Sequence, residues 1–185
     1  MPATALVVVV PEVEHLVAAL RLRYDPLAER GVPAHVTVLF PFVSPIDQRT
    51  AERVASVVRR QPPFVTRFAA VDDWPGMVVW LRPEPSAPFS ALIAAAIAEF
   101  PEHPPDIDSI AEPIPHLTVA NGVDAATAST IRHELEPSLP IRCQISELAL
   151  LGEDETGHWA VARTWPLGES STTQRATDGT LRGIV

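Results

Sequence analysis

The sequence is poor in cysteine and contains no long hydrophobic run. Cys143 is the only cysteine among 185 residues, so an intramolecular disulfide and a thiolate-rich zinc site are both excluded. Residues 1–10 are apolar, but Pro11 and Glu12 end the run well short of a membrane-spanning length. No basic segment precedes it, as one would in a signal peptide. We therefore expect a cytoplasmic protein without a membrane partner.

Basic charge is also scarce. The chain has 14 Lys and Arg against 23 Asp and Glu, a formal net charge of −9 and a pI near 5.1. Proteins that grip long nucleic acid normally present a basic surface that displaces counterions. The sequence thus argues against a duplex-binding protein. It leaves open a small nucleotide or an RNA end as the partner, since a few neutral donors can hold one phosphate.

Glycine is infrequent, with 8 copies against 20 prolines. The sequence has no Gly-rich phosphate loop, no dinucleotide-binding fingerprint and no Gly-x-Ser-x-Gly nucleophile elbow. Many prolines predict short elements with well-marked ends. Nucleotide-binding loops of the common kinds and serine hydrolase chemistry are therefore excluded.

Hydrophobic residues make up 46% of the chain, enough for one domain with a real core. Alternating and three-to-four spaced apolar residues predict both strands and helices. We expect strands over 5–10, 34–40, 64–71, 77–81, 116–120, 141–151 and 158–165, and helices over 11–20, 44–60, 86–100 and 124–136. The tail, 168–185, is rich in Ser, Thr and Gly and is expected to be flexible.

The order of these elements repeats. Each half has a strand containing His-x-Thr-Val, then a helix, then a two-stranded hairpin. We therefore predict an α+β, bilobal duplicated fold in residues 1–167. Two antiparallel sheets with flanking helices would enclose a central cleft, a common place for a ligand.

The two His-x-Thr-Val segments carry the strongest chemical signal. They begin at His35 and His116, and 116 − 35 gives a spacing of 81 residues. Positions i and i+2 of a strand share one face, so each histidine lies beside its threonine, Thr37 or Thr118. A hydroxyl can donate to a phosphate oxygen while the imidazole exchanges a proton with a bridging or attacking oxygen.

Two such half-sites facing each other would supply one acid and one base for displacement at phosphorus. Histidine suits both roles because its ordinary pKa is about 6.5. The alternative is that both are ordinary strand histidines. Their shared context argues against this, because each follows a Pro-rich loop, opens an apolar strand and occupies the same place in the repeat. Which histidine is the base is left open.

The sequence resembles the two-histidine phosphoesterase superfamily, which includes bacterial RNA 2′,3′-cyclic phosphodiesterases, also called 2′-5′ RNA ligases. Segments 23–26 and 33–42 resemble the approach and first motif, and 115–120 resembles the second. The resemblance implies hydrolysis of a cyclic phosphodiester without a metal or another cofactor, with ligation as the reverse reaction. It gives His35 and His116 catalytic roles and makes Thr37 and Thr118 phosphate ligands.

Two aromatic residues near the first motif are candidates for substrate binding. Tyr24 precedes the motif in a turn, and Phe42 follows the strand. Each could instead be a packing residue. For Tyr24 we favour packing over substrate binding, and for Phe42 the two roles are equally plausible. Trp80 and Trp159 fall in hairpin strands and are expected in the core.

Other polar residues do not predict a metal site. The group His103, Asp106 and Asp108 falls in a Pro-rich loop, where solvated side chains are expected. His133 and Glu136 are three apart on a helix but lack further ligands. The remaining alternative to an enzyme is a non-catalytic protein that binds a nucleotide or phosphorylated metabolite in the same cleft. The oligomeric state cannot be read from these patterns.

Overall fold

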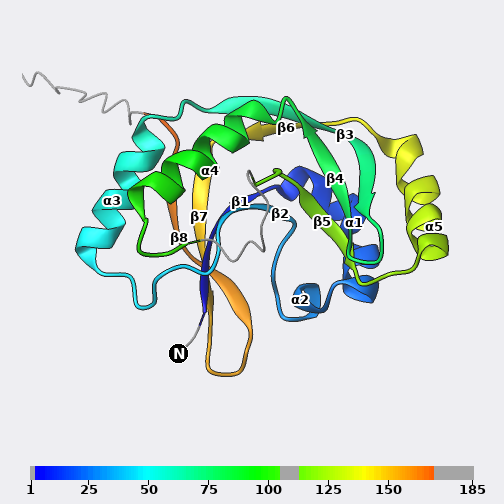
Figure 1. The fold of residues 1–185 in the computed structure, drawn as a ribbon, viewed down its shortest axis with the longest axis horizontal. Helices are drawn as coiled ribbons and strands as arrows, with labels where there is room; N and C mark the ends of the chain where they lie inside the picture. Colours follow the sequence, from blue (N-terminus) through cyan, green and yellow to red (C-terminus); the bar gives the residue numbers. More distant parts are fainter. Residues whose placement is uncertain (1–2, 105–112, 169–185) are drawn as a thin grey trace, which may run out of the picture.

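A computed structural model describes residues 3–104 and 113–168. These residues form a mixed fold of strands and helices around one curved antiparallel sheet (Figure 1). The strand order is β6-β3-β4-β5-β2-β1-β7-β8. The strands are β1 (Thr4–Val9), β2 (His35–Leu39), β3 (Phe64–Trp74), β4 (Val78–Glu84), β5 (Leu117–Asn121), β6 (Ile141–Ile145), β7 (Glu147–Glu153) and β8 (Trp159–Pro166).

Helices cover the two ends of this sheet. They are α1 (Pro11–Tyr24), α2 (Pro26–Glu29), α3 (Gln48–Arg59), α4 (Ala87–Glu99) and α5 (Ala125–Leu135), with a 3-10 turn, η1, at Glu136–Ser138. In Figure 1, α3 and α4 lie at the left end and α1, α2 and α5 at the right. The side chains of Asp47 and Asp124 cap α3 and α5 by accepting hydrogen bonds from backbone N–H groups.

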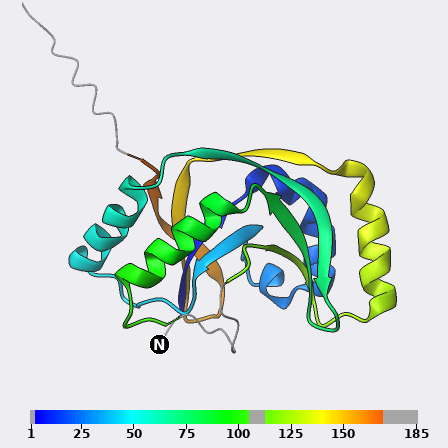
Figure 2. The ribbon, with the colours of Figure 1, turned by 45° about the horizontal axis from the view of Figure 1, so that its top comes forward.

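The expected pair of separate sheets is wrong, because the strands are joined into one. Val36 of β2 pairs with Leu117 of β5, and this contact links two groups of four strands. Both side chains are fully buried, so pairing covers backbone polar groups that would otherwise be left without partners in the core. The turned view in Figure 2 shows the resulting sheet with α4 lying across it.

The sequence repeat does not correspond to two consecutive lobes. The expected strand over 141–151 divides at Ser146 into β6, which pairs with β3, and β7, which pairs with β1. The hairpin that follows the first motif therefore extends the sheet beyond β5, while the hairpin that follows the second motif extends it beyond β1. Each motif strand is thus supported by the other half of the sequence.

The main core lies between the sheet and its helices. Val13, Val17 and Leu20 of α1 are buried, and α1 packs against β5 and β6. In the part of the chain that the structure describes, no helix has the length and apolarity needed to cross a bilayer. The predicted flexible tail lies, apart from Gly168, outside the described residues.

Candidate active site at the junction of two motif strands

The two motifs occupy neighbouring strands at the middle of the sheet. Val36 lies directly opposite Leu117, and both point into the core. Residues on either side of them therefore point to the other face. The antiparallel register sets His35 opposite Thr118, and Thr37 opposite His116, at side-chain spacings of about 5 Å across the strands. The structure thus brings the four predicted residues onto one patch.

This patch is open to solvent. Thr37 is exposed, and His35, His116 and Thr118 are half-buried. The residues between them, Val36 and Leu117, are 0% exposed. A ligand can therefore reach the four polar side chains while the strands beneath them are held by the core.

Each imidazole is fixed by the same backbone contact. Nδ1 of His35 lies 2.8 Å from the carbonyl oxygen of Pro33, and Nδ1 of His116 lies 2.8 Å from that of Ile114. A carbonyl only accepts, so Nδ1 carries the hydrogen in both rings. Nε2 is left for a ligand, as a base when bare and as an acid when protonated. The carbonyl two residues before each histidine therefore sets the tautomer.

His35 has a strongly lowered proton affinity. Burial lowers its pKa from 6.5 to about 4, and the charges of Arg21 and His116 act in the same direction. The carbonyl of Pro33 and the carboxylate of Asp25 oppose this shift. His35 is therefore neutral at pH 7, and its Nε2 can accept a proton.

A buried ion pair from α1 lies close enough to act on His35. Arg21 and Asp25 are 1% and 4% exposed, and Nη2 donates to Oδ2 at 3.0 Å. Asp25 also accepts from the side-chain amide of Asn121 at 3.0 Å and from the backbone N–H of Leu27. This network ties the end of α1 to the end of β5. Sequence reasoning missed it, because Arg and Asp four apart on a helix usually form a surface pair.

His116 has an aromatic surrounding instead. The rings of Trp74 and Trp80 lie 4.9 and 5.9 Å from its imidazole, both edge-on. Burial lowers the pKa of His116, and the hydrogen bond to Ile114 opposes the shift. Trp80 is buried as expected, yet it also borders the site, and Trp74 was not anticipated.

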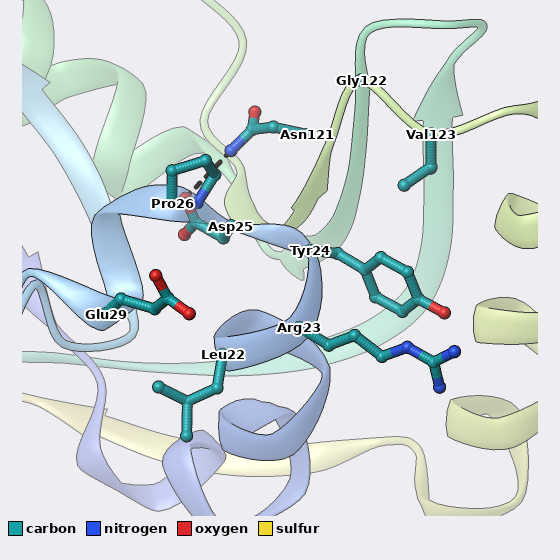
Figure 3. Close-up of a pocket in the computed structure, with 9 residues that line it drawn as sticks. All are labelled: Leu22, Arg23, Tyr24, Asp25, Pro26, Glu29, Asn121, Gly122 and Val123. Atoms are coloured by element: carbon teal, nitrogen blue, oxygen red, sulfur yellow. Dashed lines mark hydrogen bonds between the residues drawn. The ribbon is translucent and has the colours of Figure 1, made fainter.

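Tyr24 and Phe42 do not join the four motif residues. Tyr24 lines a separate pocket of about 340 Å³ at the ends of α1 and β5, beside Arg23, whose guanidinium lies 5.0 Å from its ring (Figure 3). None of the four motif residues lines that pocket. Phe42 is buried and packs edge-on against Phe100 at 5.0 Å. Trp159 lies in a second buried cluster, with Val7.

Within residues 3–104 and 113–168, no three His, Cys, Asp or Glu side chains gather as they would around a metal ion. His133 is exposed on α5, and Glu136 begins η1. Asp106 and Asp108 lie outside the described residues. Burial raises the pKa of the Cys143 thiol to about 12, so it is not a nucleophile at neutral pH.

Known structures share this fold. LigT of E. coli with 3′-AMP bound gives a TM-score of 0.60 at 15% identity, covering 91% of this chain and 100% of that one. A structure described as a phosphoesterase gives 0.57 at 13% identity, with coverage of 91% and 100%. TT0787 of Thermus thermophilus gives 0.55 at 19% identity, also with coverage of 91% and 100%.

Sequence comparison reaches the same group. No curated protein matches the sequence. The family model of the 2′-5′ RNA ligase superfamily, however, matches residues 9–157, which include both motif strands. The chain therefore belongs to the 2′-5′ RNA ligase superfamily of two-histidine phosphoesterases.

Proposed function

We propose that this protein is a metal-independent phosphodiesterase that hydrolyses the 2′,3′-cyclic phosphate of a nucleotide or an RNA end. The observation that carries the proposal is the pair of equivalent half-sites on β2 and β5. Each has an imidazole held through Nδ1 by a carbonyl oxygen, and a threonine on the same face. His35 and His116 are the proposed catalytic residues, and Thr37 and Thr118 the phosphate ligands.

In the proposed reaction, one histidine accepts a proton and the other donates one. Water attacks phosphorus, and one neutral Nε2 takes its proton. The bond from phosphorus to one ribose oxygen breaks, and the other, protonated Nε2 gives a proton to that oxygen. The two threonine hydroxyls donate to the non-bridging oxygens as charge builds on them. The product carries a 2′- or 3′-phosphate, and attack by a ribose hydroxyl in the reverse direction would join two ends.

The surroundings of the rings favour one assignment of roles. Burial and the guanidinium of Arg21 disfavour a proton on His35. His116 instead lies beside Trp74 and Trp80, and no guanidinium charge is among the causes of its pKa shift. In this proposal His35 is the base that activates water, and His116 is the acid that protonates the departing ribose oxygen.

The relatives support a nucleotide as the substrate. LigT structures have been solved with 3′-AMP, ATP and NADP+, so this fold can hold small nucleotides. We propose the same class of ligand for this protein. We also propose a reducing cytoplasm as its location, because a chain with one cysteine has no intramolecular disulfide.

Hydrolysis can be followed directly by phosphorus NMR. Wild-type protein in EDTA should convert 2′,3′-cyclic AMP to a single monophosphate, and the chemical shift of the product identifies the 2′ or 3′ isomer. No turnover of any 2′,3′-cyclic nucleotide or cyclic-phosphate RNA end would overturn the proposal. Saturable nucleotide binding in that case would favour the non-catalytic alternative.

The pH profile should be shifted to the acid side. The pKa of His35 is lowered to about 4 and that of His116 is lowered from 6.5, both mainly by burial. The base must be unprotonated, so kcat/KM should rise as the pH increases through about 4. The acid must be protonated, so kcat/KM should then decrease with increasing pH, and the midpoint of this decrease should lie below pH 6.5. Initial rates measured from pH 3.5 to 9 at constant ionic strength test this. An optimum above pH 7 would contradict the assignment.

Removing either motif hydroxyl should weaken stabilisation of the phosphoryl oxygens. Thr37→Val and Thr118→Val keep the shape of the side chain but lose the donor, so kcat/KM should fall about 10–100-fold in each. Thr130→Val on the exposed face of α5 is the matched control. Unchanged rates in both motif variants would remove the threonines from the mechanism.

A further inference from the structure

Two arginines lie opposite each other on neighbouring strands, at a distance from the four motif residues. Arg67 of β3 pairs directly with Arg142 of β6, and both are exposed. Like charges directly opposite each other destabilise a sheet. In the described part of the chain, neither guanidinium has a carboxylate within 4.0 Å. No carboxylate of the described residues therefore offsets this repulsion, and a bound anion would.

The register puts this pair on the same face of the sheet as the histidines. Thr118 pairs with Trp80 of β4, so Trp80 points to the motif face. Glu84 lies four residues further along β4 and therefore shares that face. Glu84 pairs with Arg67, and Arg67 pairs with Arg142. The alternate residues, Leu81 and Pro83, are buried on the other face.

The spacing places the arginine pair some way along the sheet from the histidines. β3 and β6 are two and three strands away from β5, and the arginine pair lies two residues beyond the level of His116. With about 4.8 Å between strands and about 3.3 Å per residue, the Cα atoms of Arg67 and Arg142 lie about 12 and 16 Å from that of His116. A second phosphate, further along the same chain as the first, fits this separation.

Nearby carboxylates are already engaged. Arg82 is on the same face and contacts Asp72 at 2.9 Å and Glu84 at 3.1 Å. This face of β3, β4 and β6 therefore holds three guanidinium groups and two carboxylates: those of Arg67, Arg82 and Arg142, and those of Asp72 and Glu84. Arg67, Glu84 and Arg142 also line a pocket of about 280 Å³. A local positive site in a chain of net charge −9 contrasts with the rest of the molecule, and planar guanidinium groups suit phosphate oxygens.

We propose that Arg67 and Arg142 bind a second phosphate of the substrate, so that a short RNA chain is preferred over a mononucleotide. The inference rests on the proposed function, because the histidines are taken to hold the terminal phosphate. It refines that function by assigning two residues to the phosphodiester that precedes the reacting end of an RNA substrate. The interaction needs no basic surface beyond this pair.

Binding of products separates this inference from turnover. The probes are 3′-AMP and the trinucleotide ApApA with a 3′-phosphate, titrated by calorimetry into wild type, Arg67→Gln and Arg142→Gln. Arg59→Gln, an exposed arginine at the end of α3, is the matched control. We expect the trinucleotide to bind wild type about tenfold or more tightly than 3′-AMP, since phosphate contacts dominate affinity. Each substitution should weaken trinucleotide binding about three- to tenfold, with 3′-AMP binding unchanged.

Equal wild-type affinity for the two probes would overturn the inference, as would an equal loss of both probes in the arginine variants. Raising the salt concentration should weaken trinucleotide binding less steeply in the variants than in wild type, because each has one phosphate contact fewer. A failure of the proposed function would look different. Cyclic phosphates would then remain intact while the probes still distinguished wild type from the two variants.

Discussion

His35→Ala and His116→Ala should each lower kcat for a 2′,3′-cyclic nucleotide about 10²–10⁴-fold, since each removes one proton handler. The Nε2 of each ring is the atom left free by the Nδ1 contact, and alanine supplies no substitute for it. Substrate affinity should change less than kcat, because the threonine hydroxyls remain. Steady-state rates in EDTA, measured at the pH optimum of wild type, test this.

The double variant and a surface control sharpen the result. If the two histidines act together on one phosphate, kcat of the double variant should be only slightly lower than that of the less active single variant. His133→Gln changes an exposed histidine on α5 and should retain full activity. Activity equal to wild type in both single variants would end the proposed mechanism. Loss of wild-type activity in EDTA would point to a metal instead.

The second large effect concerns stability. Arg21→Met should lower the free energy of unfolding by about 3–5 kcal/mol, because it leaves the Asp25 carboxylate buried without its cation. Asp25 is 4% exposed and would retain only its contacts to Asn121 and the backbone of Leu27. Urea denaturation followed by tryptophan fluorescence gives the unfolding free energy.

The partner substitution tests the physical reason. Arg21→Met combined with Asp25→Leu removes both charges and should recover part of the lost stability. Arg60→Gln changes an exposed arginine at the end of α3 and should alter stability by less than about 0.5 kcal/mol. An equally small effect of Arg21→Met would show that the buried pair does not support the junction of α1 and β5.

Features that depend on local sequence could be predicted from the chain alone. The alternation in each His-x-Thr-Val segment placed His and Thr on one face of a strand, because side-chain direction depends only on the backbone of that strand. Helix α5 could likewise be predicted from its capping residue Asp124 and its apolar spacing. The family assignment rested on the same short segments, and the match over residues 9–157 confirmed it.

Strand partners could not be deduced in this way, because pairing depends on residues far apart in the chain. The pairing of Val36 with Leu117 joined the two expected sheets into one, and the break at Ser146 sent β6 and β7 to different neighbours. The buried Arg21–Asp25 pair beside His35 and the arginine pair Arg67–Arg142 also arise only when distant segments meet. Periodicity along the chain thus determined which residues share a face, and the tertiary packing alone decided which faces meet and what charge surrounds each imidazole.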